Sequence, residues 1–99
     1  MTEITMLESI VKMAKKRVPA SHFRVILFGS RAEGLAREGS DYDIAIDSAE
    51  IIPFVSLAKL EADLDDLPTL SKVDLVDLRT ASPSIAQTAR TEGKVIYEQ

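Results

Sequence analysis

Two short segments carry residue types suited to binding phosphate and a cation. The first is Gly29-Ser30, which follows an apolar run, and the second is Asp41-Tyr42-Asp43, which begins after ten intervening residues. A glycine lets a ligand approach the backbone closely, while a serine hydroxyl and the free N–H groups of a following helical turn can donate to phosphate oxygens. Gly29-Ser30 is therefore a candidate phosphate site. The same pair would also suit a plain turn with a helix-capping serine.

The second segment places two carboxylates close together. Asp41 and Asp43 open a predicted strand in which alternate side chains share a face, so both project to the same side. Neighbouring carboxylates repel each other unless a cation lies between them, which favours a divalent metal. The alternative is that one or both belong to a solvated loop mouth after Gly39-Ser40.

A third acidic residue favours the metal hypothesis. Asp74 interrupts the apolar segment 72–78 near its start, where a charge is costly without a partner. If this strand lies beside the strand of Asp41 and Asp43, the three carboxylates could hold two Mg²⁺ ions about 4 Å apart. Such a pair of ions activates an attacking hydroxyl and holds a triphosphate.

Other polar residues are assigned structural places. Asp77 has the opposite strand parity to Asp74 and is predicted to lie at the surface or in a turn. Asp47 is expected to cap the turn that follows its strand. His22, directly before the first strand, is predicted to be a solvated turn residue rather than a base. The chain has no Cys, so a metal would be a hard cation bound by carboxylates.

Helices and strands alternate along the chain and would position these residues. Ile4, Leu7 and Ala14 follow helical spacing up to Pro19, and Phe54 begins a second periodic segment. The expected elements are helices over 4–18, 54–67 and 83–92 and strands over 23–28, 43–47, 73–78 and 95–97. The short connection 34–41 leaves little room for a crossover helix, which favours antiparallel pairing of the first two strands. The predicted fold class is α/β or α+β, with a mixed sheet and helices packed on it.

Composition limits the classes of protein. The 99 residues, 45% of them hydrophobic, predict a single domain over residues 1–99. No segment approaches the roughly 18 apolar residues of a membrane span. The charged, periodic start and the absence of Cys predict an unprocessed cytoplasmic protein. A net charge of −4 argues against binding of extended nucleic acid, although a small anion could bind locally.

The combination of Gly29-Ser30, Asp41-x-Asp43 and Asp74 closely resembles the signature of the DNA polymerase β-type nucleotidyltransferase superfamily. The size of the chain resembles the minimal nucleotidyltransferase (MNT) branch. This resemblance implies the nucleotidyltransferase fold, with Gly29 and Ser30 holding the phosphates of a nucleoside triphosphate. It also implies that Asp41 and Asp43 bind the metals. Asp74 would be the third carboxylate, which assists deprotonation of the acceptor hydroxyl.

Four further residues lie within or directly beside the signature. Arg31 and Ser40 are expected in the nucleotide site. Arg31 and Arg37 could neutralise phosphate charge, and an exposed position is the alternative for both. Glu33 departs from the pattern of many relatives, and an inward-pointing acid there would weaken attraction of a triphosphate.

The resemblance implies an Mg²⁺-dependent transfer of AMP from ATP. Stand-alone MNT chains resemble the antitoxin of HEPN/MNT toxin–antitoxin pairs, which adenylylates a tyrosine of its HEPN ribonuclease partner. We expect the same role here, because the domain leaves no room for an acceptor-binding unit. One alternative is an antitoxin that neutralises its partner by stoichiometric binding, through the first helix or the acidic face 61–66. Another is a subunit that transfers nucleotides to a small molecule or RNA.

Overall fold

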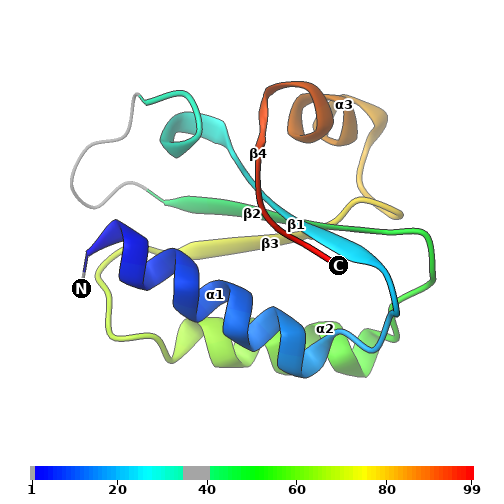
Figure 1. Ribbon diagram of the computed structural model, residues 1–99, viewed down its shortest axis with the longest axis horizontal. Coiled ribbons are helices and arrows are strands. Elements are labelled where there is room, and N and C mark those ends of the chain that lie inside the picture. Colours follow the sequence, from blue (N-terminus) through cyan, green and yellow to red (C-terminus); the bar gives the residue numbers. More distant parts are fainter. Residues whose placement is uncertain (1, 35–40) are drawn as a thin grey trace.

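The computed structural model describes residues 2–34 and 41–99, which form a four-stranded mixed sheet with helices on both faces (Figure 1). The sheet is built from β1 (Phe23–Phe28), β2 (Tyr42–Ser48), β3 (Val73–Asp77) and β4 (Lys94–Glu98). The helices are α1 (Glu3–Arg17), α2 (Phe54–Asp65) and α3 (Pro83–Glu92), with a short 3₁₀ turn, η1 (Gly29–Arg31), after β1. The predicted α+β class with a mixed sheet is confirmed.

The strand order β3-β2-β1-β4 places the two acidic strands next to each other. β1 pairs antiparallel with β2, as predicted, and also with β4, whereas β2 and β3 are parallel. In this register Phe28 lies opposite Asp43, and Asp43 lies opposite Asp74. The two carboxylates and the end of β1 therefore meet at one edge of the sheet.

The two faces of the sheet have different covers. α1 and α2 pack together on one face, and α3 covers the other (Figure 1). In β2, Tyr42, Ile44 and Ile46 belong to the larger core beneath α1 and α2, whereas Ala45 belongs to the smaller core beneath α3. Asp43 shares the strand parity of Ala45 and therefore lies on the α3 face.

Local capping explains where two helices begin. The Thr2 hydroxyl accepts a hydrogen bond from the Thr5 N–H at the start of α1, and the Ser82 hydroxyl accepts one from the Ile85 N–H at the start of α3. Pro83 occupies the first turn of α3, where its missing N–H costs nothing. The predicted start of this helix at Ser82-Pro83 is confirmed.

Two apolar residues expected on core faces are exposed instead. Ile4 is 72% exposed and Phe54 is 82% exposed. In α1 the buried row is Met6, Ile10 and Ala14, with an exact four-residue spacing that leaves Ile4 beside the row. α2 ends at Asp65, earlier than the predicted 67, and the second strand is longer than predicted at each end.

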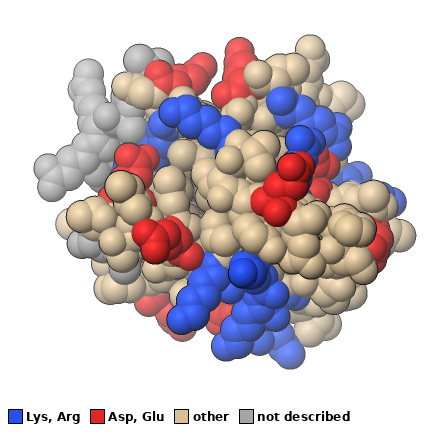
Figure 2. All heavy atoms as spheres, viewed as in Figure 1, with Lys and Arg blue, Asp and Glu red and all other residues tan. Residues whose placement is uncertain are grey.

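In the part of the chain that the structure describes, no helix combines the length and apolar character needed to cross a membrane. Figure 2 shows acidic and basic side chains interspersed on the face that carries α1 and β4.

Candidate active site

The predicted phosphate segment forms a tight turn at the end of β1. Phe28 is extended, and Gly29 then takes a left-handed conformation with φ of +74°. The carbonyl oxygen of Gly29 accepts hydrogen bonds from the N–H groups of Ala32 and Glu33, at 3.1 and 3.2 Å. The turn places half-buried Ser30 directly beyond the strand.

Gly29 lies directly against the carboxylate of Asp43. A Cβ atom at position 29 would overlap with Oδ2 of Asp43. The glycine is therefore required both by its backbone conformation and by the space that the carboxylate occupies. The close approach to the Gly29 backbone that the sequence predicted for a ligand is made in the structure by a side chain of the site itself.

Asp43 and Asp74 form the acidic centre of the site. They are register partners on parallel strands and both are half-buried. Burial raises the pKa of Asp43, and the negative charges of Asp74 and Asp41 raise it further. Lys72 lies 3.3 Å from Oδ1 of Asp74, but this lysine is 71% exposed and its charge is screened by solvent. The pair is therefore electrostatically unfavourable without a bound cation.

Asp41 precedes β2 and is exposed. It is near enough to act on the charge of Asp43. Within residues 2–34 and 41–99, however, no three His, Cys, Asp or Glu side chains are close enough to bind one metal ion together. Mg²⁺ commonly uses one or two protein carboxylates and completes its shell with substrate phosphates and water. The repelling pair Asp43 and Asp74 fits that kind of binding.

Comparison with known proteins identifies the family. The sequence profile of the family described as polymerase beta, nucleotidyltransferase matches residues 8–99. This chain belongs to the polymerase beta nucleotidyltransferase family. The protein adenylyltransferase MntA of Shewanella oneidensis is 35% identical to it over 92 residues, which cover 89% of this chain. The chain spans 62% of the length of that relative.

Solved structures agree with this assignment. A chain in the crystal structure of a toxin–antitoxin with AMP-PNP is 32% identical, with a TM-score of 0.74, and the match covers 94% of this chain and 73% of that one. A tri-AMPylated HEPN toxin of Shewanella oneidensis in complex with MNT antitoxin gives 29% identity and a TM-score of 0.69, over 99% of this chain and 74% of the other. The resemblance to the MNT branch is confirmed.

In this family member the side chain of Arg31 contacts other residues of the chain. Its guanidinium lies over the ring of Tyr42, with its central carbon 3.8 Å from the ring centroid. It also donates to the hydroxyl of Ser71 at 3.3 Å and approaches Glu3 at 3.9 Å. Burial raises the pKa of Tyr42, an effect that the charge of Arg31 partly offsets. These contacts were not predicted, although the sequence shows an arginine directly after Gly29-Ser30 and an aromatic residue between Asp41 and Asp43.

Four other polar residues were considered for the site from the sequence, and none of them is placed in it by the described residues. Ser40 and Arg37 lie outside the described residues. Glu33 is exposed, one residue beyond buried Ala32. His22 is also exposed and precedes β1, at the strand end opposite Gly29. It lies too far along the strand to act on a nucleotide at the Gly29 turn.

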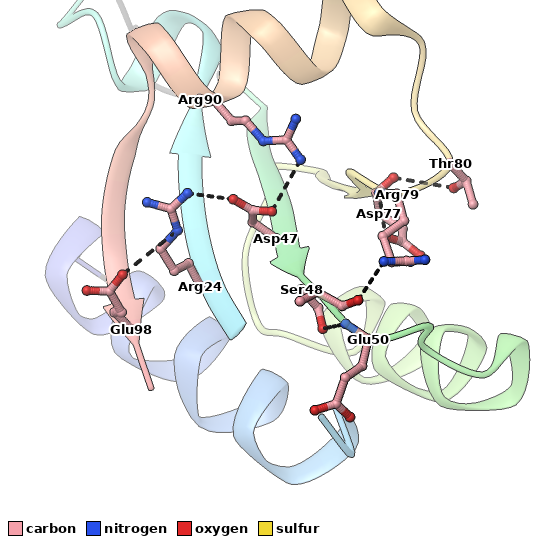
Figure 3. A network of polar contacts seen from close by, with 10 residues as sticks. Arg24, Asp47, Ser48, Glu50, Asp77, Arg79, Thr80, Arg90 and Glu98 are labelled. Carbon is pink, nitrogen blue, oxygen red and sulfur yellow. Dashed lines mark hydrogen bonds and ion pairs between the residues drawn. The ribbon is translucent and has the colours of Figure 1, made fainter. Parts of the chain in front are cut away.

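The prediction for Asp47 is wrong. Its carboxylate accepts from Arg24 of β1 at 2.6 Å and from Arg90 of α3 at 3.4 Å (Figure 3). Burial raises the pKa of Asp47, but the hydrogen bonds and charges of the two arginines outweigh burial and lower it. The hydroxyl of Ser48 accepts from the Glu50 N–H and caps the turn instead. Asp47 lies on the α3 face, where strand pairing and helix packing bring cations from distant parts of the sequence.

Asp77, predicted to lie at the surface or in a turn, is the last residue of β3, and its carboxylate caps the turn that follows the strand. Its Oδ1 accepts from the Arg79 N–H at 3.0 Å, and its backbone carbonyl accepts from the Thr80 hydroxyl (Figure 3). The Ala81 N–H donates to the same carbonyl. The last residue of β3 thus has its carboxylate engaged away from the pair of Asp43 and Asp74.

A separate apolar hollow of about 550 Å³ lies between α1 and β4. It is lined by Leu7, Val11, Lys12 and Ile96 among others, and none of the residues assigned to phosphate or metal lines it. The hollow is therefore separate from the turn and carboxylates at the ends of β1, β2 and β3.

Proposed function

We propose that this chain is a protein adenylyltransferase that transfers AMP from ATP to a tyrosine hydroxyl of a HEPN-type toxin, and so acts as its antitoxin. The observation that carries this proposal is the pairing of Asp43 with Asp74 directly against the Gly29 turn. Its support from other proteins is the 35% identity to a protein adenylyltransferase and the likeness to chains in toxin–antitoxin complexes. The pair of Asp43 and Asp74 supports nucleotidyl transfer, and the relatives suggest a HEPN-type toxin as the acceptor.

The nucleotide would lie at the open end of β1. Backbone N–H groups of the Gly29 turn and the Ser30 hydroxyl would donate to its phosphate oxygens. Ser40 is expected to complete the proposed nucleotide site, and Arg31 belongs to the same turn as Ser30. Asp41, Asp43 and Asp74 would bind Mg²⁺, with two ions as the expected number. Bound Mg²⁺ would neutralise the triphosphate and the negative charge that develops during transfer.

The reaction requires positioning and proton transfer but no covalent enzyme intermediate. The acceptor oxygen forms a bond to the α-phosphorus while the bond between that phosphorus and the bridging α–β oxygen breaks, and pyrophosphate leaves. The phenolic proton passes to Asp74, which lies on β3, an outer strand of the sheet. Holding the two reactants in line supplies most of the rate enhancement expected of such a site.

The direct test is transfer to a partner. The chain is incubated with the HEPN-type protein encoded beside it, ATP and Mg²⁺, and intact-mass spectrometry measures added AMP groups. We expect modification that requires all components and is lost in Asp41→Ala/Asp43→Ala. A partner that is neutralised without any added mass, and equally well by this double variant, would overturn the enzymatic proposal in favour of stoichiometric binding.

A second measurement tests the site without a partner. ATP with Mg²⁺ should raise the melting temperature of the chain, whereas Mg²⁺ alone should not, because the phosphates complete the metal shell. The double variant Ser30→Ala/Asp43→Ala should lose this increase. An undiminished increase in that variant would place the nucleotide elsewhere.

A further inference from the structure

Arg31 contacts more than one segment of the candidate site. It belongs to η1, the turn that carries Gly29 and Ser30. Its guanidinium stacks on Tyr42, the residue between Asp41 and Asp43. The same group donates to Ser71, which lies three residues before Asp74 in the segment leading into β3.

These contacts are well shielded. The Arg31 side chain is only 10% exposed, and Tyr42 is 4% exposed. A planar guanidinium can stack on a ring with its face and donate hydrogen bonds from its edge at the same time. Next to this contact, the Tyr42 N–H donates to the Lys72 carbonyl at 2.8 Å, which begins the pairing of β2 with β3. The guanidinium thus lies where the three segments converge.

The orientation of Tyr42 separates this contact from the acidic centre. Tyr42 is part of the core beneath α1 and α2, whereas Asp43 lies on the opposite face of the sheet. The guanidinium and the Asp43 carboxylate therefore lie on opposite faces of the sheet. Glu3, 3.9 Å away in the first turn of α1, adds a weak charge interaction on that same side.

We propose that Arg31 is a positioning residue, which fixes the phosphate turn, the start of β2 and the approach to β3 relative to one another through Tyr42 and Ser71. Its effect on transfer rests on the proposed function, because transfer needs Gly29, Asp43 and Asp74 in register. A displacement of about 1 Å between reacting groups can cost about 100-fold in rate. A contact that joins these segments therefore acts on turnover without touching the nucleotide.

The first arm of the test does not depend on enzymatic activity. Hydrogen–deuterium exchange is measured for Arg31→Lys, which keeps the charge but loses the planar fork. Exchange should rise about tenfold or more in three segments together, 29–32, 42–44 and 73–75, since all lose one shared contact. Arg24→Lys, which alters an ion pair at the other end of β1, is the matched control and should leave these segments unchanged.

The second arm measures the rate of AMP transfer to the partner. In Arg31→Lys, kcat should fall about 10- to 100-fold while KM for ATP changes less than about threefold. Tyr42→Phe keeps the ring and should retain activity, whereas Tyr42→Leu should reproduce the loss. The double variant Arg31→Lys/Tyr42→Leu should be no worse than either single variant, because both break the same contact.

The outcomes separate this proposal from the proposed function. If wild type transfers no AMP, the proposed function fails, and exchange alone decides the role of Arg31. A rise in exchange confined to 29–32, or equal in Arg24→Lys, overturns the positioning role. So does a raised KM with unchanged kcat, which would assign Arg31 to direct phosphate contact.

Discussion

At the scale of single residues, Gly29 joins two constraints that are usually met by different positions. Its φ of +74° lies in the left-handed region that residues with a Cβ rarely adopt, and the carboxylate of Asp43 fills the space of the missing side chain. A substitution would both strain the turn and displace Asp43. The Cβ atom that a substitution adds at position 29 would therefore disturb both the turn and the carboxylate pair of Asp43 and Asp74.

Gly29→Ala should lower the free energy of unfolding by about 2–4 kcal/mol, the sum of backbone strain and the displacement of a half-buried carboxylate. Urea denaturation measures this change, and the loss of the melting-temperature increase with ATP and Mg²⁺ measures its effect on the site. Gly34→Ala is the control, because Gly34 has the same φ of +74° but no atom of the described residues within 4 Å of its Cβ position. Gly34→Ala should cost only about 1 kcal/mol. Equal losses in both variants would show that the contact with Asp43 is unimportant.

The Asp47 carboxylate predicts a pH dependence of stability. Its folded pKa is lowered, so its ionised form stabilises the folded state fully above the ordinary aspartate pKa, and this contribution is lost as the pH falls through the folded pKa. Asp47→Asn should reduce the free energy of unfolding by about 1–2 kcal/mol at pH 7. The gap to wild type should narrow as the pH falls below about 4.

Urea titrations of both proteins between pH 7 and pH 2.5 measure that gap. Asp65→Asn, which alters an exposed carboxylate at the end of α2, should differ from wild type by less than about 0.5 kcal/mol at pH 7. A gap for Asp47→Asn that stays constant across the range would contradict the role of its charge in holding Arg24 and Arg90.

At the scale of helices and strands, α3 depends on a short-range signal at its start. The Ser82 hydroxyl satisfies the Ile85 N–H, and the helix then packs on Ile26 and Ala45 across the face that also carries Asp43. Ser82→Ala should cost about 1 kcal/mol and speed hydrogen exchange in the first turn of α3. Ser84→Ala, two residues further on in the first turn of α3 and exposed, should be neutral or slightly stabilising. Equal destabilisation by the two variants would refute the capping role.

The elements themselves were largely predictable from the sequence, because hydrophobic period, Pro19 and Ser82-Pro83 are local signals. The apolar run 23–28 favours a buried strand, and β1 lies between two other strands of the sheet. The side of α1 that faces the core was predicted less well, since exposed Ile4 follows the same period as the buried row. Period alone does not reveal which of two adjacent rows meets another element.

In the site, too, local patterns were predictable from the sequence and tertiary contacts were not. Placing Asp74 beside Asp43 required only strand parity and neighbouring strands, and the register agrees with it. Arg24 and Arg90 lie 23 and 43 positions from Asp47, and Ser71 lies 40 positions from Arg31. Such pairs depend on tertiary packing. A charged residue within a strand can be recognised from the sequence as needing a partner, but the identity of that partner cannot.

At the scale of the whole molecule, two carboxylates that repel each other, Asp43 and Asp74, destabilise an otherwise well-packed sheet. β2 is buried along most of its length, yet its second residue, Asp43, lies opposite another acid on β3. Like charges directly opposite each other on neighbouring strands destabilise a sheet by about 0.2–1 kcal/mol. Binding of ATP with Mg²⁺ would reverse this cost, so the folded protein should be most stable as the ternary complex.

Asp43→Asn separates the two effects in one measurement. Without nucleotide, the variant should unfold at equal or higher urea concentration than wild type, because the repulsion with Asp74 is removed. With ATP at about 100 times its dissociation constant and excess Mg²⁺, wild type should gain about 2.7 kcal/mol, and the variant should gain much less. Asp77→Asn is the matched control on β3, since its carboxylate accepts from the Arg79 N–H. It should lose stability slightly and keep the full gain from nucleotide. If Asp43→Asn destabilises the nucleotide-free protein and still gains as much as wild type, Asp43 is a structural residue and the metal lies elsewhere.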